Sequence, residues 1–360
     1  MTRIDLPGPP SRILLIKPSA LGDIVHTLPI LGLLKRRWPD AQVSWLVGSA
    51  FAGLLEGHPL LHEVVRFDRK RFSKAWWNPA ALVELVKFGR GLREHHFDLV
   101  IDLQGLLRSG FTAKIARSPV RVGFANAREM AWVFYTHRVP VASLEQHALE
   151  RYLLVTDALG CGRESIEFRF PLNDEDRAAA RQLTNGAVRY AVLIPGTNWP
   201  TKRWPVERFA ALVEPIKSRF GFDVVVAGSA GESALGDRIA GAKNLCGKTT
   251  LRQLVALLEG ASLVIANDSG PMHIAAALGR PLVTMFGPTN PVRTGPFGRD
   301  DSVVRVDIPC SPCYSRRCSH TSCMKWLSAE AVMNVAEEQL RRSPNDETRM
   351  TNQFRMTKSE

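Results

Sequence analysis

Runs of apolar, β-branched residues alternate with helical patterns along the first half of the chain. Residues 12–18 and 42–48 are predicted strands, and a helix is predicted between them over 23–38. FDLVIDLQG (97–105) is a further buried strand, which precedes a helix near 106–117 and the short strand RVGF. Strands that are apolar throughout and alternate with helices are typical of a parallel sheet covered on both faces.

The same alternation begins again after residue 175. The strands VRYAVLIPG, FDVVVAGS, SLVIAND and LVTMFGP are separated by the predicted helices PVERFAALVEPIKSRFG, TLRQLVALLEGA and HIAAALGRP. The charged segment 161–176 is a predicted linker. We therefore predict an α/β protein with two Rossmann-like, doubly wound domains, 1–165 and 166–342, that face a central cleft. Residues 343–360 lack apolar periodicity and are predicted to be a disordered tail.

The composition indicates a folded protein with an anionic partner. Of the 360 residues, 45% are hydrophobic and 23% are charged, which excludes a largely disordered chain. Lys and Arg number 47 against 35 Asp and Glu, a net charge of +12, which favours a phosphorylated substrate, an acidic membrane surface or nucleic acid. The chain has no apolar run long enough for a membrane span and no apolar core of a secretory signal, so we expect a cytosolic protein.

The first candidate site is the loop KPSALGD, because ligands of open α/β sheets bind at the carboxyl ends of strands. Gly22 permits a tight turn after Ser19, and Asp23 is placed at the positive end of the next helix. Two interpretations stay open. Asp23 caps the helix, which is the commoner role of Asp at this position, or it acts as a general base.

The loop PGTNWPTKRWP (195–205) is the second candidate. Thr197 and Asn198 offer polar groups, and Lys202 supplies positive charge ahead of a helix that begins near Pro205. A cation beside a helix N-terminus suits a diphosphate. A solvated basic loop is the alternative, but the three prolines stiffen the segment and favour a preorganised site.

The third candidate follows the strand SLVIAND. Asp268, Ser269 and Gly270 come directly after it, and His273 is predicted to open a helix of small residues. Gly270 lets the backbone approach a ligand, and the free N–H groups of the helix suit phosphate oxygens. His273 alone is more simply a buried core histidine, but its place in this loop favours a ligand-binding role.

Basic and aromatic residues are interleaved between 66 and 93. This segment holds eight Lys or Arg residues, among them Lys70, Arg71 and Lys74, against two acidic residues. A charge run is usually a solvated face, but aromatic side chains among the cations suit an interface with lipid and phosphate. Nucleic acid is the weaker interpretation, because no nucleic-acid-binding signature accompanies the segment.

Four of the six cysteines lie close together and are candidate metal ligands: Cys310, Cys313, Cys318 and Cys323. Such a cluster can hold a structural zinc ion, but its spacing departs from that of paired CxxC motifs and free thiols in a cytosolic loop are the favoured explanation. The sequence also lacks the P-loop, GxGxxG and GxSxG patterns. Their absence argues against a P-loop ATPase, a dinucleotide oxidoreductase and a triad hydrolase.

Four segments together resemble glycosyltransferase family 9, the ADP-heptose:lipopolysaccharide heptosyltransferases: RILLIKPSALGDIVHTLPIL, VIDLQGLLRSG, PGTNWPTKRWP and NDSGPMHIAAALGRPLVTMFGPTNP. The resemblance spans about residues 12 to 300. It implies a GT-B fold, an ADP-heptose donor held by the C-terminal domain and a lipopolysaccharide-core acceptor held by the N-terminal domain. It also implies an inverting transfer with an aspartate base and no required metal or other cofactor.

The resemblance assigns roles by position. It makes Asp23 the base and implies donor contacts for Thr197, Asn198, Lys202, Asp268, Ser269, Gly270 and His273. It implies acceptor contacts for Ser19, Gly22, His26, Lys70, Arg71, Lys74, Gln104 and Arg128. QHALER and NAREM are similar to the branch that adds the first heptose to the Kdo residues of lipid A, whereas the Cys loop is similar to the second-heptose branch. Asn198 stands where a second Thr is frequent.

These features predict a heptosyltransferase that acts at the cytoplasmic face of the inner membrane as a peripheral protein. Its expected partners are ADP-heptose, a lipid A–Kdo or inner-core acceptor and an anionic membrane surface, and nucleic acid is not expected. A transferase of another nucleotide sugar in a different surface glycan is the alternative enzyme. A non-catalytic basic binding module is the alternative from another class. The position of the added heptose stays open.

Overall fold

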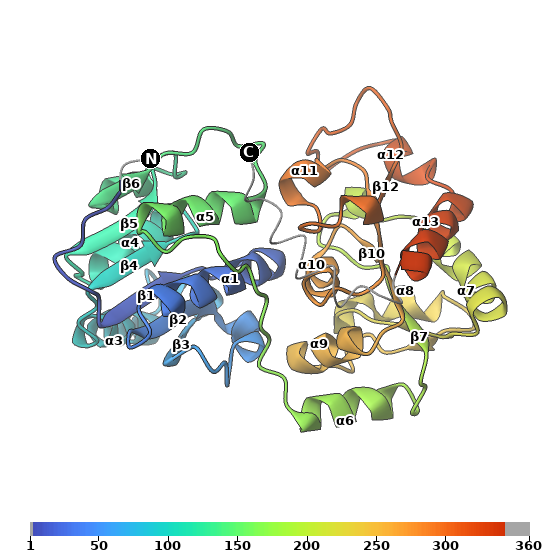
Figure 1. The fold of residues 1–360 in the computed structure, drawn as a ribbon, viewed down its shortest axis with the longest axis horizontal. Helices are drawn as coiled ribbons and strands as arrows, with labels where there is room; N and C mark the ends of the chain where they lie inside the picture. The colour runs from blue at the N-terminus through green and yellow to red at the C-terminus, as the bar shows by residue number, and fades with distance from the viewer. Residues whose placement is uncertain (1–2, 343–360) are drawn as a thin grey trace. The chain divides into compact units, whose positions relative to one another are not determined.

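A computed structural model describes residues 3–342 of the protein. The chain divides into two compact units, Met1–Pro171 and Leu172–Glu360. Each unit is built on one sheet of six strands whose pairings are parallel, with helices packed against the sheet (Figure 1). This arrangement confirms the predicted α/β class with two doubly wound sheets. The predicted tail, 343–360, lies outside the described residues.

The first unit has the strand order β3-β2-β1-β4-β5-β6. Its strands are β1 (Arg12–Ile16), β2 (Gln42–Gly48), β3 (Glu63–Phe67), β4 (Leu99–Asp102), β5 (Val120–Phe124) and β6 (His137–Val139). Its α-helices are α1 (Leu21–Arg37), α2 (Arg69–Phe72), α3 (Pro79–Glu94), α4 (Leu107–Ile115) and α5 (Ala148–Ala158), with 3-10 turns at Ser49–Leu54 and Ala131–Phe134. The order reverses beside β1, so the loops after β1 and β4 lie next to each other at the carboxyl edge of the sheet.

Apolar side chains cover both faces of this sheet. Leu14 and Ile16 of β1 pack with Leu92 of α3 and Ala113 of α4 on one face. Helices α1 and α5 run together on the other face (Figure 1). Because successive side chains of a strand point to opposite faces, the continuous apolar run of β1 fills both layers.

The second unit has the order β12-β11-β10-β7-β8-β9. Its strands are β7 (Tyr190–Ile194), β8 (Asp223–Val226), β9 (Lys243–Asn244), β10 (Leu263–Asn267), β11 (Leu282–Phe286) and β12 (Val303–Arg305). Its α-helices are α6 (Asp174–Leu183), α7 (Val206–Phe220), α8 (Ser233–Asp237), α9 (Leu251–Glu259), α10 (Gly270–Ala277), α11 (Pro291–Thr294), α12 (Ser322–Lys325) and α13 (Ala329–Arg342). Short 3-10 turns lie at Pro200–Lys202, Ala230–Glu232 and Asp300–Ser302. Because β7 and β10 are neighbours, the two candidate donor loops follow adjacent strands.

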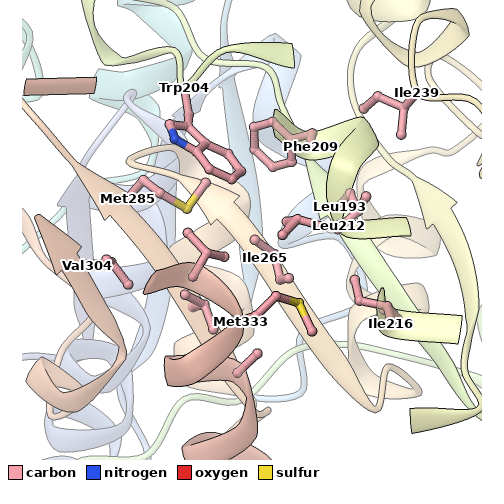
Figure 2. Packing of buried hydrophobic residues seen from close by; sticks show 14 of the residues in the cluster. Leu193, Trp204, Phe209, Leu212, Ile216, Ile239, Ile265, Met285, Val304 and Met333 are labelled. Atoms are coloured by element: carbon pink, nitrogen blue, oxygen red, sulfur yellow. The ribbon is translucent and has the colours of Figure 1, made fainter. Parts of the chain in front are cut away.

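The core of the second unit lies between its sheet and helices α7 and α13 (Figure 2). Trp204 is buried there, with its ring 5.0 Å from that of Phe209, and its indole N–H donates a hydrogen bond to the Leu327 carbonyl at 2.8 Å. Trp204 closes the loop 195–205, so this anchor fixes the far end of the loop to the core.

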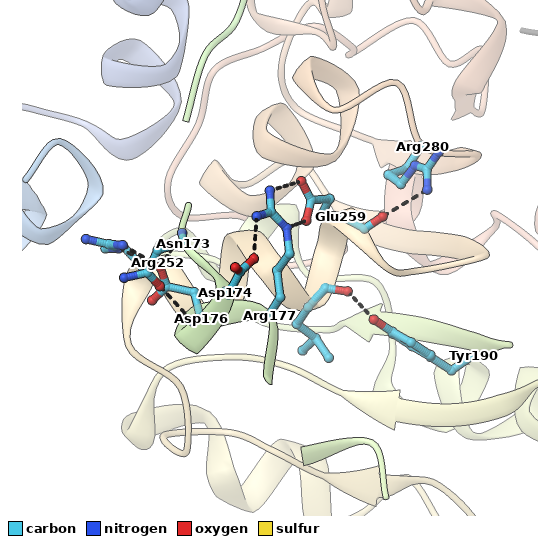
Figure 3. A network of polar contacts seen from close by, with 9 residues as sticks. Asn173, Asp174, Asp176, Arg177, Tyr190, Arg252, Glu259 and Arg280 are labelled. Atoms are coloured by element: carbon cyan, nitrogen blue, oxygen red, sulfur yellow. Dashed lines mark hydrogen bonds and ion pairs between the residues drawn. The ribbon is translucent and has the colours of Figure 1, made fainter. Parts of the chain in front are cut away.

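Polar contacts attach α6 to α9 (Figure 3). The Arg177 guanidinium donates to both oxygens of Glu259, at 2.7 and 3.1 Å, and Arg252 Nε donates to Asp176 at 2.9 Å. Asn173 caps the helix by accepting a hydrogen bond from the Asp176 N–H at 2.9 Å. The last residues of the predicted linker are therefore part of the second unit.

The structure also departs from the predicted pattern. Strands β3 and β6 and helices α3 and α5 are additional to the predicted elements. Helix α10 begins at Gly270, so His273 lies within its first turn and does not open it. Strands β3 and β6 have only five and three residues, too few for their apolar pattern to indicate an element by itself. Within residues 3–342, no helix has both the length and the apolar character needed to cross a bilayer.

Candidate active site

The Asp23 carboxylate lies in the first turn of α1 and is held from several directions. Its Oδ1 accepts a hydrogen bond from the Tyr152 hydroxyl at 2.8 Å, and its Oδ2 accepts one from the Ala20 N–H at 3.2 Å. Lys17 Nζ lies 3.7 Å from Oδ2. The contact with Ala20 is a helix-capping bond, yet 37% of the Asp23 side chain is exposed. The carboxylate is thus both fixed and accessible.

Lys17 is a buried cation beside this carboxylate. Its Nζ donates a hydrogen bond to the Leu103 carbonyl at 3.1 Å and lies 4.9 Å from the centre of the Tyr152 ring. Burial lowers the pKa of Lys17, and the neighbouring Asp23 and Asp102 carboxylates oppose this effect. The two carboxylates therefore favour the charged form of Lys17.

Helix α5 brings Tyr152 to Asp23 from a distant part of the chain. Burial, together with the charge of Asp23, raises the pKa of Tyr152 well above its ordinary value. The hydroxyl therefore remains a proton donor. His147 caps the same helix by accepting from the Leu149 N–H at 3.2 Å, and its ring lies 4.8 Å from that of the buried His26. This pairing places the QHALER segment against α1.

A second carboxylate, Asp102, supports the neighbouring loop. It is fully buried at the end of β4, and its Oδ2 accepts a hydrogen bond from the Tyr135 hydroxyl at 2.6 Å. Burial raises the pKa of Asp102, and the hydrogen bonds that it accepts lower it. Oδ1 accepts from the Gln104 N–H at 2.8 Å, and the Gln104 side-chain oxygen accepts from the Ser19 N–H at 3.3 Å. The loops after β1 and β4 are thereby joined.

The structure does not bring all predicted acceptor residues to Asp23. Lys70 and Arg71 lie on α2 and Lys74 in the turn after it, which follow β3, and β2 separates β3 from β1 in the sheet. The Arg71 guanidinium pairs with Glu84. Arg128 is exposed, and its N–H donates to the Gly105 carbonyl at 3.0 Å. The predicted acceptor set thus forms one group around the β1 and β4 loops and a separate basic group after β3.

In the second unit, the partly buried Lys202 forms an ion pair with the buried Asp268. Lys202 Nζ lies 2.6 Å from Asp268 Oδ2, and the Thr289 hydroxyl donates to the same oxygen at 2.6 Å. These residues follow β7, β10 and β11, which are neighbouring strands, so three loops meet at one edge of the sheet. Asp268 neutralises and orients Lys202, whose ammonium group is largely removed from solvent.

Thr197 connects the same two loops. Its hydroxyl donates to the Asp268 carbonyl at 3.1 Å, while its own carbonyl accepts from Arg203 Nε at 3.1 Å. Asn267 donates to the Pro195 carbonyl at 2.8 Å. Thr197 is buried, whereas the adjacent Asn198 is exposed. The backbone of both loops is therefore fixed from within the unit.

The first turn of α10 lies in this site. Ser269 precedes the helix and makes no side-chain capping bond, and its buried hydroxyl has no hydrogen-bond partner among the described residues. Gly270 begins the helix, and His273 is buried in its first turn. A helix N-terminus beside Lys202 is a favourable place for a phosphate group.

The cysteine loop contacts the donor loop. Trp199 has the Lys202 ammonium and the Arg316 guanidinium each 4.6 Å from its ring centre, and the Thr201 hydroxyl donates to the Ser315 carbonyl at 2.8 Å. The four candidate metal ligands line one pocket of this loop: Cys310, Cys313, Cys318 and Cys323. Among residues 3–342, however, no three His, Cys, Asp or Glu side chains are arranged to hold a metal ion.

Comparisons with known proteins identify the family of this chain. The model of glycosyltransferase family 9 (heptosyltransferase) matches residues 85–324. Lipopolysaccharide heptosyltransferase 1 of Pseudomonas aeruginosa is 36% identical over 319 residues, which cover 86% of this chain and 88% of that protein. Lipopolysaccharide heptosyltransferase 1 of Escherichia coli is 31% identical over 306 residues, 82% of this chain and 93% of that protein. The chain belongs to glycosyltransferase family 9.

The solved structures agree with this assignment. The Escherichia coli heptosyltransferase WaaC with ADP-2-deoxy-2-fluoro heptose matches with a TM-score of 0.74 and 28% identity, over 91% of this chain and 99% of that one. The family 9 protein therefore has the predicted GT-B fold and is a glycosyltransferase.

Several side chains at these two candidate sites are not among the residues predicted from the sequence. Tyr152, Thr289 and Arg316 reach the two candidate sites only through the fold. Glu232 is a further side chain of this kind, because it lies against the loop 195–205. Its carboxylate is so close to Gly196 that a β-carbon on Gly196 would be 1.9 Å from Glu232 Oε1. The sequence signals nearest to them are the QHALER segment, which ends directly before Tyr152, the segment ending in GPTNP, which contains Thr289, and the cysteine cluster, which contains Arg316.

Proposed function

We propose that the protein transfers heptose from ADP-heptose to the inner core of lipopolysaccharide with inversion at the anomeric carbon. Family membership carries this proposal. The relatives in Pseudomonas aeruginosa and Escherichia coli are named lipopolysaccharide heptosyltransferase 1, and the Escherichia coli structure holds an ADP-heptose analogue. The Escherichia coli heptosyltransferase 2 is 28% identical, less than either, which favours the first heptose as the one added.

Asp23 is proposed as the general base. An acceptor hydroxyl must lose its proton as it attacks the anomeric carbon, and an accessible carboxylate can take that proton. The hydrogen bonds from Tyr152 and Ala20 and the charge of Lys17 stabilise the ionised carboxylate and fix its direction. A single displacement needs no second nucleophile, so one carboxylate suffices.

The donor diphosphate is proposed to bind at the first turn of α10 beside Lys202. Negative charge develops on the leaving ADP, and an ammonium group with preorganised N–H dipoles stabilises it. Asp268 would repel phosphate, so we assign it to holding Lys202 and Thr289 in place. Ser269 and His273 are proposed donor contacts in the same turn. These groups supply positive charge without a divalent ion.

The proposed acceptor is Kdo-linked lipid A, and the proposed location is the cytoplasmic face of the inner membrane as a peripheral protein. Ser19 and Gln104 lie in the β1 and β4 loops, and His26 lies one turn after Asp23 in α1; these three are the proposed contacts to the reacting sugar. Lys70 and Lys74 lie on the basic segment after β3, where they suit acidic groups farther along the acceptor.

The test is product analysis by mass spectrometry after incubation with ADP-heptose and Kdo–lipid A, with and without EDTA. The proposal expects a heptosylated product in both conditions. Asp23→Asn should lower kcat by about a hundredfold or more, whereas Asp157→Asn, which alters a surface ion pair of α5, should not. Transfer from UDP- or GDP-sugars in place of ADP-heptose, or full activity of Asp23→Asn, would contradict the assignment.

A further inference from the structure

Helix α3 presents an apolar surface to solvent. Leu82, Val83 and Val86 lie on one side of the helix and are exposed, while Ala81 and Leu92 on the other side are buried. A surface helix usually has one apolar stripe, which faces the core. α3 has a core-facing stripe and a second one that faces outward.

Two tryptophans extend this surface before the helix begins. Trp76 is 84% exposed and Trp77 is 61% exposed, and their rings are in contact with centroids 5.2 Å apart. Asn78 caps α3 by accepting from the Ala81 N–H at 3.2 Å, which fixes the tryptophans beside the first turn. We call Trp76, Trp77, Leu82, Val83 and Val86 the α3 apolar surface.

Exposed cations surround the α3 apolar surface. Between residues 68 and 94 the chain has seven basic residues against three acidic ones, and the basic ones are all exposed: Arg69, Lys70, Arg71, Lys74, Lys87, Arg90 and Arg93. Asp68 accepts the capping bond of α2 from the Arg71 N–H, and Glu84 pairs with the Arg71 side chain. The segment therefore retains a net positive charge.

We propose that the α3 apolar surface inserts into the interfacial region of an anionic lipid bilayer. This inference rests on the proposed function, in which the acceptor is anchored in a membrane. Tryptophan favours the boundary between lipid headgroups and acyl chains, and cations beside an amphipathic helix bind anionic headgroups. A second copy of the chain fits less well, because the same cations would face each other across the interface.

The experiment measures binding of the full chain to vesicles by co-sedimentation. Vesicles of phosphatidylglycerol with phosphatidylethanolamine are compared with vesicles of phosphatidylcholine alone. We expect binding to the anionic vesicles that weakens as salt is added. The double variant Trp76→Ser/Trp77→Ser should lower the partition coefficient by about tenfold or more, since it removes two large apolar side chains from the interface.

Trp326→Ser is the matched control. Trp326 is 64% exposed at the end of α12 in the second unit, so its loss should leave vesicle binding unchanged. Equal loss in both variants, or equal binding of the native chain to both vesicle types, would overturn the proposal. The proposal would also be overturned if the native chain self-associated and the double variant lost this self-association but kept native vesicle binding.

Heptose transfer separates this inference from the proposed function. The double variant should transfer normally to a deacylated, water-soluble Kdo acceptor and poorly to Kdo–lipid A in vesicles. Equal reduction with both acceptors would contradict a membrane role for the surface. If the native chain binds anionic vesicles through the two tryptophans yet heptosylates neither acceptor, the proposed function fails and the membrane surface stands.

Discussion

Replacing Tyr152 by Phe removes one hydroxyl group from the proposed base and little else. The hydroxyl donates to Asp23 Oδ1 at 2.8 Å, while the ring stacks near Phe124, with centroids 6.3 Å apart, and lies under the Lys17 ammonium. Phenylalanine keeps the volume and both ring contacts. The variant therefore isolates the hydrogen bond that fixes the carboxylate.

The structure sets the size of the effect. A hydrogen bond to a charged group contributes about 1.5–3 kcal/mol to stability. Since 37% of the Asp23 side chain is exposed, water replaces part of the lost bond, and we take about half of that range, roughly 0.75–1.5 kcal/mol. If the bond acts fully on the reacting geometry, kcat/KM falls by about four- to thirteenfold.

The assay follows ADP release with Kdo–lipid A as acceptor. Because the pKa of Tyr152 is raised well above its ordinary value, its hydroxyl stays protonated, and the ratio of native to variant kcat/KM should be constant from about pH 7 to 9. A ratio that changes with pH in this range would show that Tyr152 itself exchanges a proton, and an unchanged kcat/KM would refute the positioning role.

Tyr190→Phe is the matched control. Tyr190 is buried in the second unit, and its hydroxyl donates to the Leu257 carbonyl at 2.7 Å (Figure 3 labels Tyr190). Its loss should lower the free energy of unfolding by about 1 kcal/mol and leave kcat/KM unchanged. A fall in kcat/KM in both variants would attribute the effect of Tyr152→Phe to general destabilisation.

Three further predictions concern other parts of the chain. Lys202→Met removes the cation of the donor loop and leaves the buried Asp268 carboxylate without its ion-pair partner. Calorimetry should show that the affinity for ADP falls by about tenfold or more. Native affinity in this variant would contradict the proposed role of Lys202 in donor binding. Gly123→Ala places a β-carbon 2.3 Å from the Tyr135 ring. In denaturant, this variant should lower the free energy of unfolding by about 1–3 kcal/mol. A loss under about 0.5 kcal/mol would show that the ring moves away freely. Burial lowers the pKa of His58, so as the pH falls below 6.5 the unfolded chain binds a proton before the folded chain does. The free energy of unfolding, measured in denaturant, should therefore decrease from pH 6.5 down through the pKa of the folded state. His58→Gln should flatten this dependence on pH.

The sequence by itself determined the α/β class and the loops that carry the candidate chemistry. Strand runs such as 12–18 and 188–196 are apolar on both faces, and this pattern is a local property of the chain. Asp23, Lys202 and Asp268 each follow such a strand, and parallel strands present their carboxyl ends at one edge. Strand pattern and loop position together therefore located these residues.

Only the tertiary structure decided which side chains act together. Tyr152 reaches Asp23 across 129 residues of sequence, and Thr197 reaches Asp268 across 71. Strand order and helix packing create these contacts, and no local pattern encodes them. The outward face of α3 has the same origin, because Leu82 and Val86 have the spacing of a core stripe and their exposure depends on which face of the helix the sheet covers. Apolar spacing predicts a helix, whereas the packing of its neighbours determines which side meets water.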